Sequence, residues 1–147
     1  AGIKSDEPVE FVGHSQGGII AAQLAADPQV RSHYRVASVL TAGSPVAGFH
    51  PDSSVPMLNM ENTRDIVPAL DGGANANRGH ALTLHFDSEH LERKQGQDNP
   101  IAAHDIATYT EGGREPLSQY RGGASLGRGK KNSAGYHRGD AHAFLHF

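Results

Sequence analysis

The chain has 147 residues, enough for one domain with a single hydrophobic core, and its net charge of −3 produces no strong field of either sign. This balance excludes nucleic acid as an expected partner, and no apolar run approaches the roughly 20 residues needed to cross a bilayer. The lack of cysteine excludes disulfides and thiolate metal sites and leaves the compartment open, cytoplasmic or secreted.

The chain begins with Ala1, and no signal peptide precedes the first predicted strand. We expect it to be the later part of a longer gene product, so an export signal could lie upstream. Residues 1–121 have the patterned sequence of a folded domain. Residues 122–147 are rich in glycine, basic residues and histidine, which predicts a flexible tail.

Short β-type runs alternate with helical or longer segments in the first part. The patterns predict strands over residues 8–12, 35–42, 55–60 and 80–86. They also predict a helix over residues 16–26 that Asp27-Pro28 closes, with core-facing side chains at Ile19, Ile20, Ala22 and Leu24. Strands joined by such connections predict a parallel sheet with flanking helices, an α/β fold.

Residues 13–17 read Gly-His-Ser-Gln-Gly and match the G-x-S-x-G pattern of a nucleophile elbow. The match is specific because a predicted strand precedes it directly and a predicted helix follows directly. Such a turn strains the backbone at the serine and lifts its hydroxyl out of the sheet. We therefore interpret Ser15 as a nucleophile. His14 is expected to be a packing or pocket-wall residue, with the role of base as its alternative.

The residues beside Ser15 fit this turn. Gly13 and Gly17 are expected to be glycine because side chains there would collide where strand and helix approach, and Gly18 extends the small surface. Ser15 lies at the start of the predicted helix, where the helix dipole favours developing negative charge. The backbone N–H of Gln16 is the expected oxyanion donor.

A serine nucleophile needs a general base and a carboxylate that orients the base, in the chain order Ser, acid, His. Asp65 lies just past the predicted strand 55–60, at the sheet edge where the elbow lies. Asp71, in a Gly-rich loop, is the second candidate, and Glu61 lies nearer the strand. Asp52 precedes the strand and is expected at the opposite edge.

The chain has ten histidines, so the base is harder to choose. His104 fits best because it lies beyond the last predicted strand, where a short helical pattern begins, and a ring there can reach the serine. His90, directly after that strand, is the second candidate. The remaining histidines of this part are expected beside the last strand or at the surface: His80, His85, His33 and His50.

Four segments together resemble the class 3 lipases and related α/β-hydrolase lipases. They are GHSQGG at 13–18, TAGSP at 41–45 with a following Gly48, N-x-x-D-x-V-P at 62–68, and HDIATY at 104–109. The resemblance covers residues 8–110. In that group the elbow serine is the nucleophile, the Asp before a Val-Pro pair is the acid, and a His before a Tyr is the base. The resemblance therefore implies a triad of Ser15, Asp65 and His104.

The resemblance also implies a fold and a reaction. The fold would be an α/β hydrolase, mostly parallel, whose earlier strands and second oxyanion donor lie upstream of this chain. The reaction would be hydrolysis of a small-molecule or lipid carboxylic ester through an acyl-enzyme, with no cofactor. The alternative is a non-catalytic α/β-hydrolase-like scaffold that binds partners or lipids and has lost the chemistry.

A metal-binding function is the third hypothesis, because the spacing of His137, His142 and His146 could place two imidazoles on one helical face. With no cysteine and few nearby carboxylates, a solvated tail is the better interpretation, and we expect no metal site.

Overall fold

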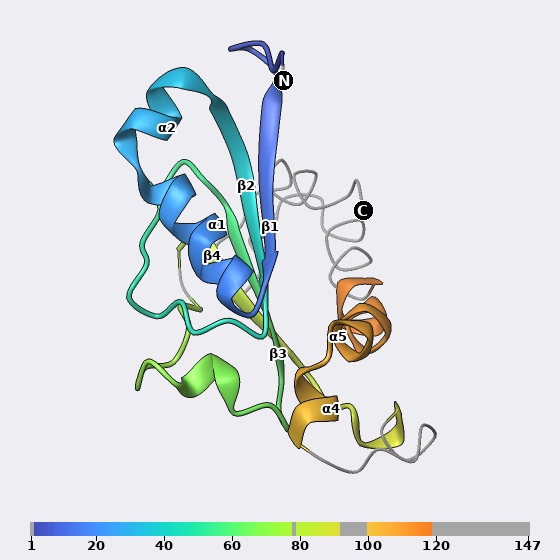
Figure 1. Ribbon diagram of the computed structural model, residues 1–147. Coiled ribbons are helices and arrows are strands. Elements are labelled where there is room, and N and C mark those ends of the chain that lie inside the picture. The colour runs from blue at the N-terminus through green and yellow to red at the C-terminus, as the bar shows by residue number, and fades with distance from the viewer. Residues whose placement is uncertain (1, 78, 92–99, 119–147) are drawn as a thin grey trace, which may run out of the picture.

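In the part of the chain that the structure describes, four parallel strands form one sheet, in the same order as they occur in the sequence. They are β1 (Pro8–His14), β2 (Arg35–Ala42), β3 (Met57–Asn62) and β4 (Ala81–Phe86). The structure is a computed structural model that describes residues 2–77, 79–91 and 100–118. Because the strands are parallel, their carboxyl ends share one edge of the sheet, which points downward in Figure 1.

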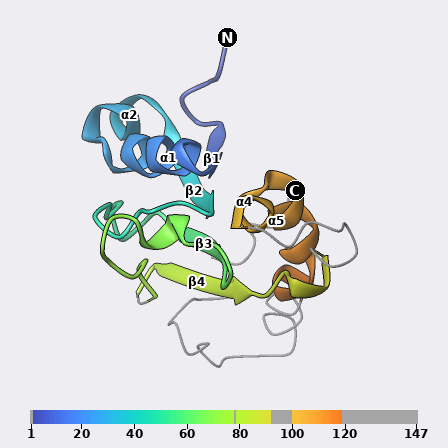
Figure 2. The ribbon, with the colours of Figure 1, turned by 60° about the horizontal axis from the view of Figure 1, so that its bottom comes forward.

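Helices lie on both sides of this sheet. Helix α1 (Gln16–Ala26) packs against β1 and β2 and leads into α2 (Pro28–His33), whereas α5 (Ile106–Gly112) packs against β3 from the other side. Helix α4 (Pro100–His104) and the 3-10 helix η1 (Val67–Ala69) lie at the carboxyl edge (Figures 1 and 2). The predicted parallel sheet with flanking helices is thus confirmed at the level of a general α/β fold.

The strand bounds differ from the prediction chiefly at β1 and β3, while β4 begins one residue later than predicted, at Ala81. β1 continues through Gly13 and His14, which pair with the end of β2. β3 begins at Met57 rather than at residue 55, after a proline that has no N–H to donate to a sheet ladder. It runs on to Asn62 because pairing with β4 continues to Phe86. The acid candidate therefore lies closer to the strand end than the prediction placed it.

Helix α2 was not predicted. Asp27 ends α1, as expected, but it also caps α2, because its Oδ1 accepts the N–H of Gln29 at 2.7 Å. Pro28 occupies the first turn of α2, where a missing N–H costs nothing. The Asp-Pro pair that closes one helix therefore also opens the next. The proposed tail over residues 122–147, with its three histidines, lies outside the described residues.

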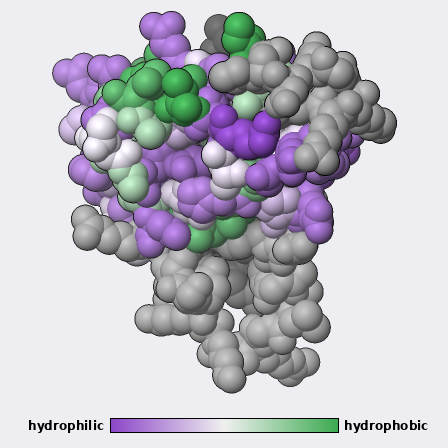
Figure 3. Space-filling model, turned by 90° about the horizontal axis from the view of Figure 1, so that it is seen from below, coloured by the Kyte–Doolittle hydropathy of each residue, from purple (hydrophilic) through white to green (hydrophobic). Residues whose placement is uncertain are grey.

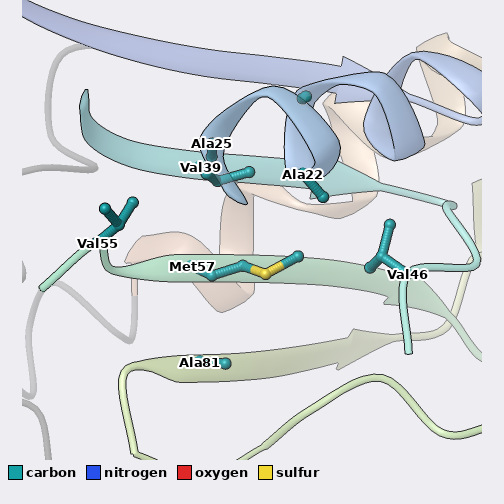
Figure 4. Close-up of a cluster of buried hydrophobic side chains, with 8 residues drawn as sticks. Ala22, Ala25, Val39, Val46, Val55, Met57 and Ala81 are labelled. Carbon is teal, nitrogen blue, oxygen red and sulfur yellow. The ribbon is translucent and has the colours of Figure 1, made fainter. Parts of the chain in front are cut away.

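Helix α1 approaches the sheet closely because it presents alanine to it. Ala22 and Ala25 have no exposed surface and contact the cluster around Val39 (Figure 4). The larger residues Ile20 and Leu24 are 52% and 38% exposed, so the expectation that they face the core is wrong. Of the four side chains expected to face the core, Ile19 and Ala22 do so, and the two exposed ones lie on the outer side of the helix.

A row of buried polar side chains crosses the sheet at one level, on the side of α1. Thr41, Asn59 and Thr83 are register partners on β2, β3 and β4. Thr41 Oγ1 donates to Asn59 Oδ1 at 2.8 Å, and Asn59 Nδ2 donates to Thr83 Oγ1 at 3.3 Å. Thr83 Oγ1 in turn donates to the carbonyl of Ala76 at 2.9 Å. The row satisfies its own polar groups inside an otherwise apolar layer.

The opposite face of the sheet receives Tyr109 of α5. Its side chain is 2% exposed and packs with Met60 and Phe86, the ring of Phe86 standing at 90° to it with centroids 5.2 Å apart. This contact lies at the carboxyl ends of β3 and β4. It therefore fixes α5, and the α4–α5 junction before it, beside the edge where the candidate site forms.

Candidate active site

Ser15 occupies a sharp turn between β1 and α1. Its backbone angles are φ 56° and ψ −127°, and it is the only residue other than glycine with positive φ in the described part of the chain. Its N–H donates to the carbonyl of Ala42 at 2.9 Å, which ties the turn to the end of β2. The strained conformation expected of a nucleophile elbow is therefore present at Ser15.

The glycines around the turn differ from expectation in one position. A Cβ at Gly13 would collide with the backbone carbonyl of Gly17, as expected for the crossing of strand and helix. A Cβ at Gly17 itself would meet nothing within 4 Å, so its predicted steric role is wrong. The close approach falls on Gly18 instead, where a Cβ would collide with the side chain of Ser44 at the end of β2.

Ser15, His104 and Asp65 form a continuous hydrogen-bonded chain. His104 Nε2 lies 2.8 Å from Ser15 Oγ, and His104 Nδ1 lies 2.6 Å from Asp65 Oδ2. The carboxylate side chain is 1% exposed and the imidazole 23%, so the chain runs from a buried acid toward the surface. The three residues selected from the sequence are thus brought together at the carboxyl edge of the sheet.

The partners assign the tautomer of His104. An ionised carboxylate can only accept, so the proton lies on Nδ1, which donates to Asp65. Nε2 is then unprotonated and accepts the hydroxyl proton of Ser15. A neutral imidazole held in this way can take a proton from the serine while the carboxylate stabilises the imidazolium that results.

Asp65 is positioned by the loop that follows β3. Its Oδ1 accepts the N–H of Val67 at 2.9 Å, so the first turn of η1 folds around the carboxylate. The loop N–H of Asp65 itself donates to the carbonyl of Asn62 at 3.0 Å. These bonds aim Oδ2 back toward the sheet edge and toward His104. The Val-Pro pair noted in the sequence forms this turn, with Pro68 buried.

His104 is the last residue of α4, and Asp105 caps α5 by accepting the N–H of Ala107 at 2.7 Å. The ring of His14 lies beside it, with centroids 4.8 Å apart, and His14 Nε2–H donates to the carbonyl of His104 at 2.8 Å. Burial lowers the pKa of His14 below its ordinary value. His14 is thus a packing residue, as expected, but one that also holds the backbone of His104.

Sequence reasoning missed two further residues at the site. Asn62 Nδ2 donates to Ser88 Oγ at 2.7 Å and to the carbonyl of Ala103 at 2.8 Å, so it fixes the residue before His104. Tyr109 donates its hydroxyl to Asp65 Oδ2 at 2.8 Å. Both lie inside the motifs quoted from the sequence, as the Asn of N-x-x-D-x-V-P and the Tyr of HDIATY. That position was the only signal of their role.

The competing acids are engaged elsewhere. Asp71 accepts the backbone N–H groups of Ala47 and Gly73, and so organises two loops. Glu61 lies 3.6 Å from His85 across the β3–β4 pair. Asp52 pairs with Arg31 of α2 at 3.2 Å.

The competing histidines do not occupy the position beside Ser15 either, which His104 fills. His90 is exposed and lies close enough to Asp87 to help lower the pKa of that carboxyl, whose main stabilising partner is the N–H of Glu89. His33 and His50 are exposed, as expected.

Gln16 is the first residue of α1, directly after the strained serine. Its backbone N–H belongs to the first turn, where donors have no acceptor within the helix and the dipole is positive. A negative oxygen formed on a carbonyl attached to Ser15 would lie near this helix end. The position fits the oxyanion role expected of Gln16.

No protein-family model matches this sequence, and no curated protein matches it. The function therefore has to be inferred from the site itself. Within the described ranges, no group of three or more His, Cys, Asp or Glu side chains is placed to hold a metal ion. None of the helices in these ranges combines the length and apolar character needed to cross a membrane.

Proposed function

We propose that this chain provides the catalytic centre of a serine hydrolase of the α/β-hydrolase type, which cleaves carboxylic esters. The observation that supports the proposal most is the chain of hydrogen bonds from Ser15 through His104 to Asp65, built on a strained strand-to-helix turn. A fold that had lost its chemistry would have no reason to keep a serine in this costly conformation. The parallel sheet and the resemblance to class 3 lipases point the same way.

The reaction follows from the proton positions. Ser15 Oγ attacks the ester carbonyl carbon as its proton passes to His104 Nε2, and the carbonyl oxygen becomes an oxyanion near the N–H of Gln16. The tetrahedral intermediate collapses, the C–O bond to the alcohol breaks, and His104 returns its proton to the leaving alkoxide. Water then repeats both steps on the acyl-serine and releases the acid. Asp65 keeps the imidazole oriented throughout and remains ionised.

Exposed apolar side chains flank both the acid and the base in the chain. Ile66 and Leu70 follow Asp65 and are 68% and 67% exposed, and Ile101, three residues before His104, is 83% exposed. The surface at this end of the molecule is otherwise largely hydrophilic, with apolar side chains gathered in patches (Figure 3). Exposed apolar side chains in the segments that carry Asp65 and His104 favour a substrate with an apolar acyl or alcohol part over a highly charged one.

The test is covalent labelling of the protein with a fluorescent fluorophosphonate, which reacts with activated serines. The wild type should be labelled and Ser15→Ala should not. His104→Ala should slow labelling by two orders of magnitude or more, since the hydroxyl then has no base. His90→Ala is the matched control, because it removes an exposed histidine of the same sheet end, and it should be labelled at the wild-type rate.

A p-nitrophenyl ester series from acetate to octanoate then gives the substrate class, with kcat/KM expected to rise with acyl length. If folded wild-type protein neither takes the label nor cleaves any ester, the hydrolase assignment is overturned and a binding role on the same fold takes its place. Labelling that persists in Ser15→Ala would overturn the choice of nucleophile.

A further inference from the structure

Asp65 Oδ2 accepts two hydrogen bonds, from two different residues. One comes from His104 Nδ1 at 2.6 Å and the other from the Tyr109 hydroxyl at 2.8 Å. The orientation of a histidine base requires only the first of these. The second places a neutral phenol on the same oxygen that attracts the imidazole proton, inside a site where the carboxylate side chain is 1% exposed.

The direction of the Tyr109 bond is fixed by its other partner. The backbone N–H of Asn62 donates to the Tyr109 oxygen at 3.1 Å, so that oxygen is already an acceptor. The phenol proton therefore points at Asp65. Burial, with the nearby Asp65 carboxylate adding to it, raises the pKa of Tyr109 well above its ordinary value, so the phenol is protonated at neutral pH.

The ring of Tyr109 has no freedom to turn the hydroxyl elsewhere. Phe86 stands edge-on to it at 5.2 Å, and the ring of His14 lies at 5.4 Å. Gly43, at φ 58°, leaves the space for it, since a Cβ at that position would lie 2.9 Å from the Tyr109 ring. The hydroxyl is thus held on Asp65 by packing from β1, β2 and β4 as well as by its own hydrogen bonds.

We propose that Tyr109 is a positioning residue of the hydrolase site, which acts through Asp65 to set how strongly the carboxylate holds the proton of His104. The inference rests on the proposed function. A donor on Oδ2 spreads part of the carboxylate charge, which weakens the attraction between Asp65 and a protonated imidazole. Tyr109 therefore keeps His104 in the neutral, proton-accepting form to lower pH than Asp65 alone would.

The other charged or titratable groups near His104 are few. The ring of His14 faces His104 from β1, and Asp105 follows His104 at the start of α5. Glu61 lies near Tyr109 at the end of β3. None of these three donates to Asp65 in the described structure. A change confined to the Tyr109 hydroxyl consequently tests the Tyr109–Asp65 bond and leaves the other charges in place.

The experiment compares pH–rate profiles of the whole protein and its variants on a p-nitrophenyl ester. Tyr109→Phe keeps the ring and removes only the donor, so the acid limb of kcat/KM should move up by about half a pH unit or more. Thr108→Val is the matched control, because it removes another buried hydrogen bond of α5, from Thr108 Oγ1 to the carbonyl of Ala102. It should lower the melting temperature and leave the acid limb in place.

A second variant should shift the acid limb in the opposite direction while leaving the shape of the side chain almost unchanged. Incorporation of 3-fluorotyrosine at Tyr109 makes the phenol a stronger donor, so the acid limb should move to lower pH than in the wild type. This variant also answers the case in which Tyr109→Phe does not fold. Far-UV circular dichroism establishes folding for each protein before the rates are compared.

Two results with active protein would overturn the role of Tyr109 and leave the hydrolase assignment intact. In the first, the acid limb is the same in the wild type and in both Tyr109 variants. In the second, it moves in the same direction in both variants. Failure of the hydrolase assignment itself is seen differently, as folded wild-type protein that neither reacts with the fluorophosphonate nor cleaves an ester. Proton NMR covers that case, because the His104 Nδ1–H signal should shift downfield in Tyr109→Phe as its bond to Asp65 strengthens.

Discussion

His14, the residue before the candidate nucleophile, donates its Nε2–H to the backbone carbonyl of His104, the residue that contacts that nucleophile. The two imidazoles lie with their centroids 4.8 Å apart and their planes inclined by 31°. The bond joins the end of β1 to the α4–α5 junction across 90 positions of sequence. The separation between Ser15 and His104 therefore depends on a side chain that belongs to neither.

Replacement of His14 tests that dependence. His14→Phe keeps an aromatic ring but removes the donor, and we expect kcat/KM for an ester to fall by about tenfold, the equivalent of one hydrogen bond. His14→Gln can offer an amide N–H where Nε2 lies and should recover most of the rate. Equal rates for the two variants would mean that ring packing, and not the hydrogen bond, sets the position of His104.

His14 should also make stability depend on pH. Burial lowers its pKa in the folded state below the ordinary value of 6.5, so below that pH the unfolded chain binds the proton more readily. Stability should therefore fall as pH decreases through 6.5 toward the folded-state value, and His14→Gln should lose less of it. Urea midpoints at pH 7 and pH 5 measure the difference. His50→Gln, which removes an exposed histidine, should follow the wild type.

Asp65→Asn and Asp71→Asn form a matched pair of isosteric changes at the same sheet edge. Asp65→Asn replaces one of two accepting oxygens by an amide NH2 and removes the negative charge, so the His104 proton is no longer held on Nδ1 and the imidazolium is no longer stabilised. We expect a rate loss of about a thousandfold or more. Among the described residues, Asp71 accepts backbone N–H groups alone, and an asparagine oxygen can still receive one of them, so its variant should retain most of the activity. Initial rates at saturating ester concentration measure both variants. A large loss of activity in Asp71→Asn would show that Asp65 is not the acid of the site.

The elbow glycines should respond differently to alanine. Gly18→Ala places a methyl group against Ser44 and should destabilise the protein by about 1–3 kcal/mol. Gly17→Ala enters open space in a helix and should be neutral or stabilise by up to about 1 kcal/mol. Chemical denaturation of both variants measures this order. A reversed order would mean that α1 does not sit against β2 as described.

Much of the candidate site could be predicted because its determinants are local. A β-type run, G-x-S-x-G and an alanine-rich helix are adjacent in the chain, so the turn at Ser15 needs no knowledge of the fold. Asp65 follows a strand, and parallel strands end at a common edge, which brings it near the serine. These inferences use only neighbouring residues and one rule of topology.

The remaining features depend on contacts between distant segments. The HDIATY motif marks Tyr109 as part of the site, but it does not indicate that the hydroxyl reaches Asp65, because that depends on how α5 packs against β3. The outward placement of Ile20 and Leu24 likewise follows from how closely α1 approaches β2, which is set by Gly18 and the alanines. Hydrophobic pattern alone cannot distinguish a helix that buries its small side from one that buries its large side.

The polar row of Thr41, Asn59 and Thr83 has a consequence for the alignment of the site. A slip of β3 by one residue would turn Asn59 to the opposite face and leave both threonines without it. A slip by two residues would restore its orientation but displace the end of β3, and Asp65 with it, by about 7 Å along the strand. The hydrogen bonds of the polar row thus favour the one strand register that places the Asp65 carboxylate level with Ser15.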